Sequence, residues 1–274
     1  MPRRLPLALV LAVVPLVADA APIRLVPHKV VYDLALASSR GARGVESARG
    51  RIAFDFTGDA CEGYALKFRQ VTVLEGGESG TRISDLRTAN FESGDGRSFR
   101  FRNDSTFDPG ATKTVDGQAE KKGGGGPLAL RLRTPKREAV SLDGGAIFPN
   151  AHMREIIAAA QAGTRTLSVK VFDGSDDGKK VYDTLSVIGP QLPAGASDAV
   201  EEPARQARLA GLVRWPVTIS YFAPGRGEQE PVYVLSFELY ENGISRALKL
   251  DYGDFALRGQ ISQLELLPES ACPR

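Results

Sequence analysis

Residues 232–252 read VYVLSFELYENGISRALKLDY, a stretch in which apolar and polar side chains alternate. Successive side chains of an extended chain point to opposite faces, so one face of this segment carries an apolar row made of Tyr233, Leu235, Phe237 and Leu239. Glu241-Asn242-Gly243 comes next, and Asn and Gly tolerate the backbone conformations of tight turns. A second strand-like run occupies 246–252. The stretch therefore predicts two antiparallel strands, each with one buried face.

The same period of two recurs along most of the chain. It is clearest near the N-terminus, where Val30, Tyr32, Leu34 and Leu36 share a face. Turn signals rich in Gly, Asn and Asp separate the runs, a pattern typical of an all-β barrel or sandwich. Further strands are expected at 51–56, 64–74, 81–91, 98–102, 128–133, 167–171, 180–188, 216–222 and 255–267.

Two segments depart from this period and predict short helices. In FPNAHMREIIAAAQAG, residues 148–163, Asn150 is expected to cap a helix through its side chain, and Gly163 to close it. The helix would present an apolar stripe to the sheet, formed by Met153, Ile156, Ile157 and Ala160. A weaker helical pattern covers Asp198 to Leu212.

The stretch FDGSDDGKKVYD, residues 172–183, resembles the opening of an EF-hand calcium loop. Strand-like runs flank it, whereas an EF-hand needs helices, and Thr184 stands where the bidentate Glu is required. Lys179 and Lys180 would also repel a divalent cation. We therefore expect Asp173–Gly178 to be the tight tip of a β-hairpin, with a weak ion site as the alternative.

The first twenty residues have the features of a secretory signal peptide. Arg3 and Arg4 precede a short apolar core, and Ala18-Asp19-Ala20 is a cleavage signal. No later run has the ~18 apolar residues of a membrane helix. Residues 1–20 are therefore expected to be a signal peptide and 21–274 a single periplasmic domain without a membrane span, which we expect to be monomeric.

The charge is nearly balanced, at +2 for the whole chain, so nothing in the composition draws it to nucleic acid. Arginines do alternate along two strands, Arg100 with Arg102 and Arg131 with Arg133. If those strands pair, they form a cationic stripe that could meet anionic envelope polymers or lipid head groups. A solvated strand face that discourages edge pairing is the alternative.

The chain has two cysteines, Cys61 and Cys272. An even number of cysteines in an exported protein favours a disulfide, which here would close a loop of about 210 residues. Two free thiols or a thiol-redox centre is the alternative, although the sequence has no C-x-x-C.

Known catalytic motifs are missing from the sequence. There is no G-x-S-x-G elbow and no phosphate-binding G-x-x-x-x-G-K-[ST] loop. The two histidines, His28 and His152, are too few for a three-histidine zinc site, and HMREI lacks the second His of a zincin. We therefore expect no catalytic, cofactor-binding or metal-binding residues.

Several long stretches resemble the EipB family of alphaproteobacterial periplasmic cell-envelope integrity proteins. They cover nearly all of the chain beyond the signal peptide and read VPHKVVYDLAL, RGRIAFDFTGDACEGYALKFRQVT, SDLRTANFESGDGRSFRF, VFDGSDDGKKVYDT, RWPVTISYF and SFELYENGISRALKLDYGDFALRGQISQLELLP. The resemblance implies a many-stranded antiparallel β-spiral, an open barrel distantly similar to lipoprotein carriers. It also implies a disulfide at the positions of Cys61 and Cys272, a periplasmic tetratricopeptide-repeat partner and no enzymatic activity.

These inferences lead to one main hypothesis and two rivals. The first is a non-enzymatic scaffold for a periplasmic protein, docking through its concave sheet and one helix. The second is a carrier of lipid or lipoprotein acyl chains, because a curled sheet lined by Phe and Tyr can enclose an apolar ligand. A weaker third is a hydrolase of envelope polymers, which would need carboxylates or a His converging in a cleft.

Overall fold

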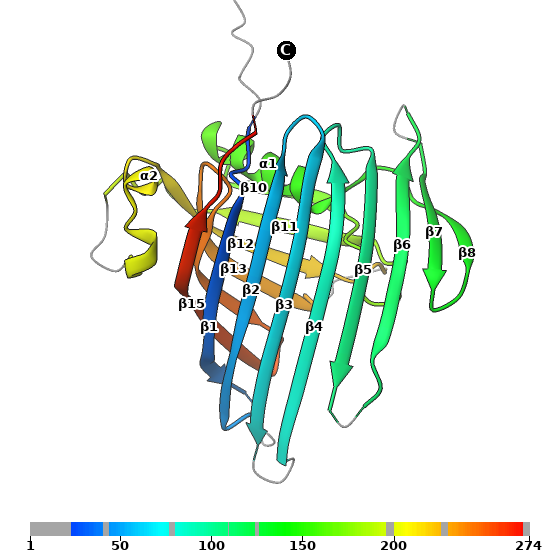
Figure 1. Ribbon diagram of the computed structural model, residues 1–274, viewed down its shortest axis with the longest axis horizontal. Helices are drawn as coiled ribbons and strands as arrows, with labels where there is room; N and C mark the ends of the chain where they lie inside the picture. The colour runs from blue at the N-terminus through cyan, green and yellow to red at the C-terminus, as the bar shows by residue number, and fades with distance from the viewer. Residues whose placement is uncertain are drawn as a thin grey trace, which may run out of the picture.

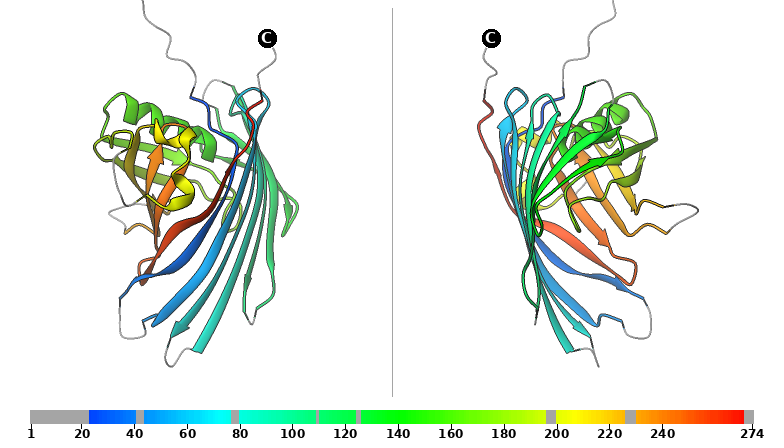
Figure 2. Two further views of the ribbon diagram at one scale, coloured as in Figure 1. Left: turned by 60° about the vertical axis from the view of Figure 1, so that its left-hand side comes forward. Right: turned by 90° about the vertical axis from the view of Figure 1, so that its right-hand side faces the viewer.

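A computed structural model describes residues 23–40, 44–76, 80–108, 110–123, 126–195, 200–225 and 230–270. These residues form one sheet of 15 strands, ordered β8-β7-β6-β5-β4-β3-β2-β1-β15-β14-β13-β12-β11-β10-β9. The sheet curls around its inner face, so that β1–β6 form one wall and β10–β14 the facing wall (Figures 1 and 2). Within the described residues its end strands β8 and β9 are not paired with each other, which confirms the predicted open, all-β architecture.

The first half of the chain builds the sheet outward from its middle. Each strand pairs antiparallel with the one before it. The bounds are β1 His28–Ser39, β2 Ser47–Asp59, β3 Gly63–Gly76, β4 Gly80–Ser93, β5 Ser98–Phe107, β6 Lys113–Lys121, β7 Leu128–Thr134 and β8 Glu138–Leu142.

The second half returns from the opposite edge. Residues 143–145 carry the chain from β8 to β9, and the strands that follow build inward until β15 pairs with β1, with His28 opposite Leu266 and Ser39 opposite Phe255. Only the β9–β10 pair is parallel among the described strand pairs. The bounds are β9 Ala146–Ile147, β10 Thr166–Val171, β11 Tyr182–Ile188, β12 Arg214–Phe222, β13 Tyr233–Tyr240, β14 Ser245–Asp251 and β15 Phe255–Leu266.

All the strands that alternation predicts are present, but β6, β8 and β9 were not predicted. The inward side chains of β6 are small, namely Val115, Gly117 and Ala119, so the strand has little hydrophobic signal. A Cβ at Gly117 would lie 2.9 Å from both the Phe101 ring and Leu132. Small residues are thus required there because larger neighbours fill the space.

Buried side chains form two separate clusters on the inner face. The main core joins β1–β3 to β11–β15 and α1. The second lies where β5–β8 face β9 and the end of β10, and we call this place, where the sheet stays open, the seam. The seam cluster consists of Phe99, Phe101, Val115, Ala119, Leu128, Leu130, Leu132, Ala146, Phe148 and Phe172.

The predicted first helix is α1, Pro149–Gln161, which buries Ile156, Ile157 and Ala160 as expected. The predicted cap is wrong, because Asn150 lies inside the helix and Phe148 is the N-cap residue, without a side-chain cap. The carboxylate of Glu92 on β4 instead accepts the N–H groups of Asn150 and Ala151, at 2.7 and 2.9 Å. Gly163 does close the helix in the left-handed region, at φ 74°.

The predicted second helix over Asp198 to Leu212 is wrong as a continuous element. The described part of that segment holds a 3-10 turn, η1, at Glu202–Ala204 and one helical turn, α2, at Ala207–Ala210. Pro203 lacks an N–H and cannot support a helix through this point. None of the helices among the described residues has both the length and the apolar character needed to cross a membrane. The predicted signal peptide, residues 1–20, lies outside the described residues.

Candidate functional site

The curled sheet encloses a cavity of about 240 Å³ between its walls. Strands β1–β3 supply one side, β13, β14 and the turn between them supply the other, and α1 contributes one residue. The lining consists of His28, Tyr32, Ile52, Phe54, Phe68, Gln70, Met153, Tyr233, Leu235, Phe237, Gly243, Ser245, Leu248 and Leu250. An apolar pocket with a few convergent polar groups is the usual form of a small-molecule site.

The polar groups of the cavity are uncharged and largely engaged with the protein. His28 stacks on Phe54 at 5.3 Å, and its Nδ1 lies 2.7 Å from the Val26 carbonyl oxygen. Burial lowers the pKa of His28 and raises that of Tyr32, whose hydroxyl donates to the Ser245 carbonyl at 2.7 Å. Gln70 donates to the Tyr252 hydroxyl at 3.1 Å.

None of the described residues that line this cavity is Asp, Glu, Lys or Arg. The paired carboxylates that the hydrolase hypothesis requires are therefore not found there. Ser245 also lines the cavity, but no hydrogen bond joins it to His28 among the described residues, so the two do not form the nucleophile–base pair of a hydrolase. The cavity is suited to holding an apolar ligand.

A row of tyrosines continues from the cavity across the facing wall, which is formed by β10–β14. Adjacent rings lie 5.1–6.0 Å apart from Tyr182 through Tyr221 and Tyr233 to Tyr252. Burial raises the pKa of each of the four. The phenol groups therefore stay neutral at physiological pH and combine apolar ring surface with a polar tip.

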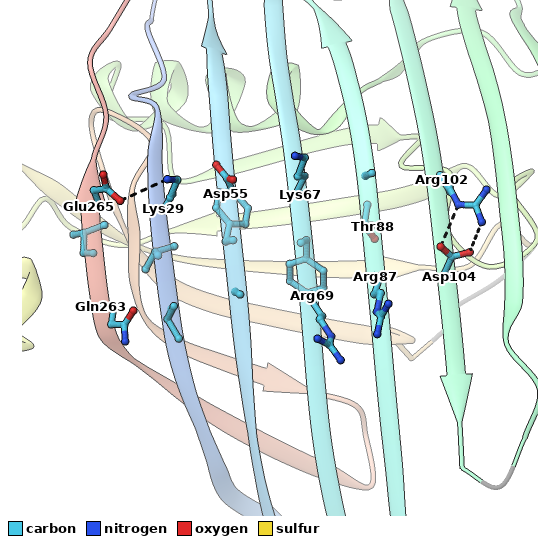
Figure 3. A pocket seen from close by; sticks show the side chains of 17 residues that line it. Lys29, Asp55, Lys67, Arg69, Arg87, Thr88, Arg102, Asp104, Gln263 and Glu265 are labelled. Atoms are coloured by element: carbon cyan, nitrogen blue, oxygen red, sulfur yellow. Dashed lines mark hydrogen bonds and ion pairs between the residues drawn. The ribbon is translucent and has the colours of Figure 1, made fainter.

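A second hollow, which we call the outer groove, lies on the opposite face of β15 and β1–β5 and has a volume of about 580 Å³ (Figure 3). Its floor includes small or aliphatic outward residues, Val31, Ala53 and Ala89. Long charged side chains rise around this floor, among them Lys67, Arg69, Arg87 and Arg102. The same strands thus present apolar side chains inward and charged ones outward.

The charges of the outer groove follow one cross-strand row. From β15 to β5 the row runs Glu265, Lys29, Asp55, Lys67, Ala89 and Arg102, each residue opposite the next. Charges alternate in sign, which stabilises neighbouring strands, until Ala89 leaves a notch between two cations. Asp55 Oδ1 is the one buried side-chain polar atom in the described part of the chain that lacks a hydrogen-bond partner.

The condition for a cationic stripe, pairing of the two arginine-bearing strands, is not met, and the alternative of a solvated strand face holds. Strands β5 and β7 do not pair with each other, because β6 lies between them. Asp116 on β6 forms ion pairs with Arg102 at 3.8 Å and with Arg133 at 2.8 Å. These arginines are exposed and interleaved with acidic groups, as in a solvated strand face.

The Asp-rich stretch is the predicted hairpin tip between β10 and β11, which pair antiparallel. Gly174, Asp176 and Gly178 adopt φ of 72°, 54° and 77°, and the Asp176 carboxylate accepts bonds from the Tyr182 hydroxyl and Lys180. The tip packs into the seam, where Asn103 donates to the Gly174 carbonyl at 2.7 Å. No group of three or more potential ligands that could hold a metal occurs in the described residues. These contacts are those of a structural turn.

The structure describes only one of the two cysteines of the predicted disulfide. Cys61 lies in the turn between β2 and β3, whereas Cys272 lies outside the described residues. A small pocket is lined by Asp59 and Ala60 together with Glu269 and Ser270, so the last described residues lie beside the Cys61 turn. The Cys61–Cys272 bond stays a prediction with which this placement agrees.

A buried network of ion pairs on the facing wall, formed by β10–β14, was not predicted from the sequence. Arg246 is 4% exposed and donates to Glu201 at 2.6 Å, while Arg214 donates to Glu238 at 2.6 Å. Arg246 also pairs with Glu238. Alternation offered a signal, because Arg246 shares a strand face with the buried Leu248 and Leu250.

Comparisons with known proteins agree on one family. A family model described as EipB-like matches residues 19–268. The chain is 38% identical over 253 residues to the cell envelope integrity protein EipB of Brucella abortus (strain 2308), covering 90% of this chain and 86% of the relative. A crystal structure of a β-barrel-like protein of domain of unknown function DUF1849, also from Brucella abortus, has 36% identity and a TM-score of 0.81 over 90% of this chain and 100% of the other.

Proposed function

The chain belongs to the EipB-like family, and from that premise we propose that it is a non-enzymatic periplasmic protein that maintains cell-envelope integrity as a scaffold for a protein partner. The name of the Brucella relative supports the envelope role. The signal-peptide features of residues 1–20 support export to the periplasm. A tetratricopeptide-repeat protein is the partner that the family resemblance suggests.

The observation that carries the scaffold function is the outer groove. The concave face and α1 were expected to dock the partner, but the concave face holds the buried core and the interior cavity, and α1 buries its apolar stripe there. The groove instead offers an accessible apolar floor at Val31, Ala53 and Ala89, with charges of both signs around it. An apolar centre with a polar rim is the anatomy of a protein interface.

Site-specific photo-crosslinking in cells tests this function. A crosslinking residue at Ala89 is expected to capture one discrete protein, and Ala53→Trp, which fills the floor, is expected to abolish that adduct. The matched control is a crosslinking residue at Ala139, which is exposed on β8, outside the groove. Identical adducts from Ala89 and Ala139, or adducts that survive Ala53→Trp, would contradict the scaffold function.

The interior cavity favours a second candidate, a carrier of apolar or acyl ligands. Its lining is dominated by Phe, Tyr, Leu and Ile, and its walls come from strands far apart in the sequence. Native mass spectrometry of protein purified without detergent is expected to detect a bound amphiphile. Leu235→Trp, which occupies the cavity, is expected to lose it, whereas Val187→Trp at an exposed site on β11 is expected to keep it.

A further inference from the structure

We infer that the interior cavity accepts acyl chains whose head group is uncharged, an alcohol or an ester, and rejects ionised fatty acids. The inference rests on the carrier function and assigns its ligand class. It is carried by the charge pattern of the lining, which among the described residues includes no Lys or Arg to neutralise a carboxylate. An ionised carboxylate that leaves water for an apolar site needs such a partner, or it loses far more hydration than it regains.

His28 does not fill that role. A carbonyl oxygen only accepts hydrogen bonds, so the 2.7 Å contact with Val26 fixes the proton on Nδ1 and leaves Nε2 as an acceptor. The charged group that acts on the imidazole is the carboxylate of Asp55, a negative one. An anion brought next to His28 would therefore meet an acceptor at Nε2 and an unfavourable field from Asp55.

The remaining polar groups match a neutral head. The Tyr32 hydroxyl already donates to the Ser245 carbonyl, while Ser245 Oγ makes only a long contact of 3.4 Å with Tyr32. Ser245 thus retains a hydroxyl that can donate to an ester carbonyl or an alcohol, and His28 Nε2 can accept from an alcohol. An ionised carboxylate could accept from Ser245, but it has no proton to donate to His28 Nε2, and its charge would have no cationic partner in the described lining.

The size of the cavity limits how much of a ligand it holds. A volume of about 240 Å³ equals that of about eight molecules of liquid water at ~30 Å³ each. It suits a segment of one chain rather than both tails of a phospholipid. A charged phosphate on a larger lipid would therefore have to lie outside the cavity.

Competition between matched ligands tests the inference. Decanol, methyl decanoate and decanoate have chains of the same length, and each is titrated at pH 7.5 against the neutral fluorophore Nile red bound to the full exported domain. Decanol and methyl decanoate are expected to displace the dye at concentrations about tenfold or more below decanoate. Leu235→Trp is expected to abolish dye binding, and Val187→Trp to leave it unchanged.

A designed cation provides the converse experiment. Met153 lines the cavity and is only partly buried, so Met153→Lys can be accommodated with its ammonium near the cavity. This variant is expected to bind decanoate better than decanol, with Met153→Leu as the uncharged control. Equal displacement by all three ligands in the unaltered protein would overturn the neutral-head inference and leave the carrier function standing. Failure of Nile red and all three ligands to bind would overturn both.

Discussion

Segments from the two halves of the chain meet twice around the curled sheet, and the two meetings differ. At the first, β1 and β15 pair over nearly their whole length, from His28 opposite Leu266 to Ser39 opposite Phe255. At the seam, β8 and β9 are not paired within the described residues, and aromatic rings in stacked and edge-on contact fill the gap. The ring centroids of Phe99 and Phe148 lie 5.1 Å apart, and both rings contact the ring of Phe172.

The backbone therefore fixes one closure of the curled sheet, and side chains fix the other. Backbone pairing commits many hydrogen bonds to a register, whereas side-chain packing depends on a few large residues. Helix α1 spans the seam, because its N–H groups bind Glu92 of β4 while its body packs on β10 and β11. The seam should therefore open before the β1–β15 junction does.

The largest expected effect concerns the junction side. If Cys61 and Cys272 are bonded, Cys61→Ser and Cys272→Ser should each lower the free energy of unfolding by up to about 5 kcal/mol, because a loop of about 210 residues is released. The double variant should add little to either single one. Chemical denaturation of all three proteins measures this, and additive losses would mean that the two sulfurs are not joined.

Loss of a seam ring should have the next largest effect. Phe172 is 0% exposed, so Phe172→Ala should cost about 3–5 kcal/mol. Phe237→Ala, a matched change in the main core at 4% exposure, should cost a similar amount. Hydrogen exchange distinguishes them, because Phe172→Ala should selectively expose β5–β8 and β10. Faster exchange at β1 and β15 in that variant would contradict the expectation that the seam opens before the β1–β15 junction.

Acid should weaken the attachment of α1. His152 is 4% exposed on this helix, and burial lowers its pKa to about 4, against 6.5 in the unfolded chain. The unfolded state therefore binds more protons between these values, and about 3 kcal/mol of stability should be lost as the pH falls from 6.5 to 4. His152→Gln should flatten that part of the stability curve, whereas an unchanged slope would assign the loss to other groups, among them His28.

The hairpin tip in the seam allows a sharper test of packing. Gly174 and Gly145 both have positive φ, at 72° and 84°, but a Cβ at Gly174 would overlap the Phe101 ring and one at Gly145 would meet nothing within 4 Å. Gly174→Ala should therefore cost about 2 kcal/mol more than Gly145→Ala, since only the first adds overpacking to backbone strain. Equal costs in thermal denaturation would mean that the tip does not pack on Phe101.

The sequence was sufficient to predict most of the strands, although not β6, β8 and β9, and it did not predict the way in which the sheet closes. Alternation reports which face of a strand is buried, and it located rows such as Tyr233 to Leu239 correctly. The pairing of Phe99 with Phe172 joins residues far apart in the chain, so no local period encodes it. For the same reason the cavity was only one alternative, because the sequence does not reveal whether Phe54, Phe68 and Leu235 fill the space between the walls.

The smallest expected effect concerns the N-terminal cap of α1, which the sequence also failed to predict. The local rule assigned the cap to Asn150, but Glu92 accepts the first N–H groups from a strand 58 residues away. Glu92→Gln should lower stability by about 1 kcal/mol, because an amide accepts these bonds more weakly than a carboxylate does and cannot pair with Arg154. Asn150→Ala should change stability by less than about 0.5 kcal/mol. Thermal denaturation of both variants decides between the two caps, and a larger loss for Asn150→Ala would restore the local one.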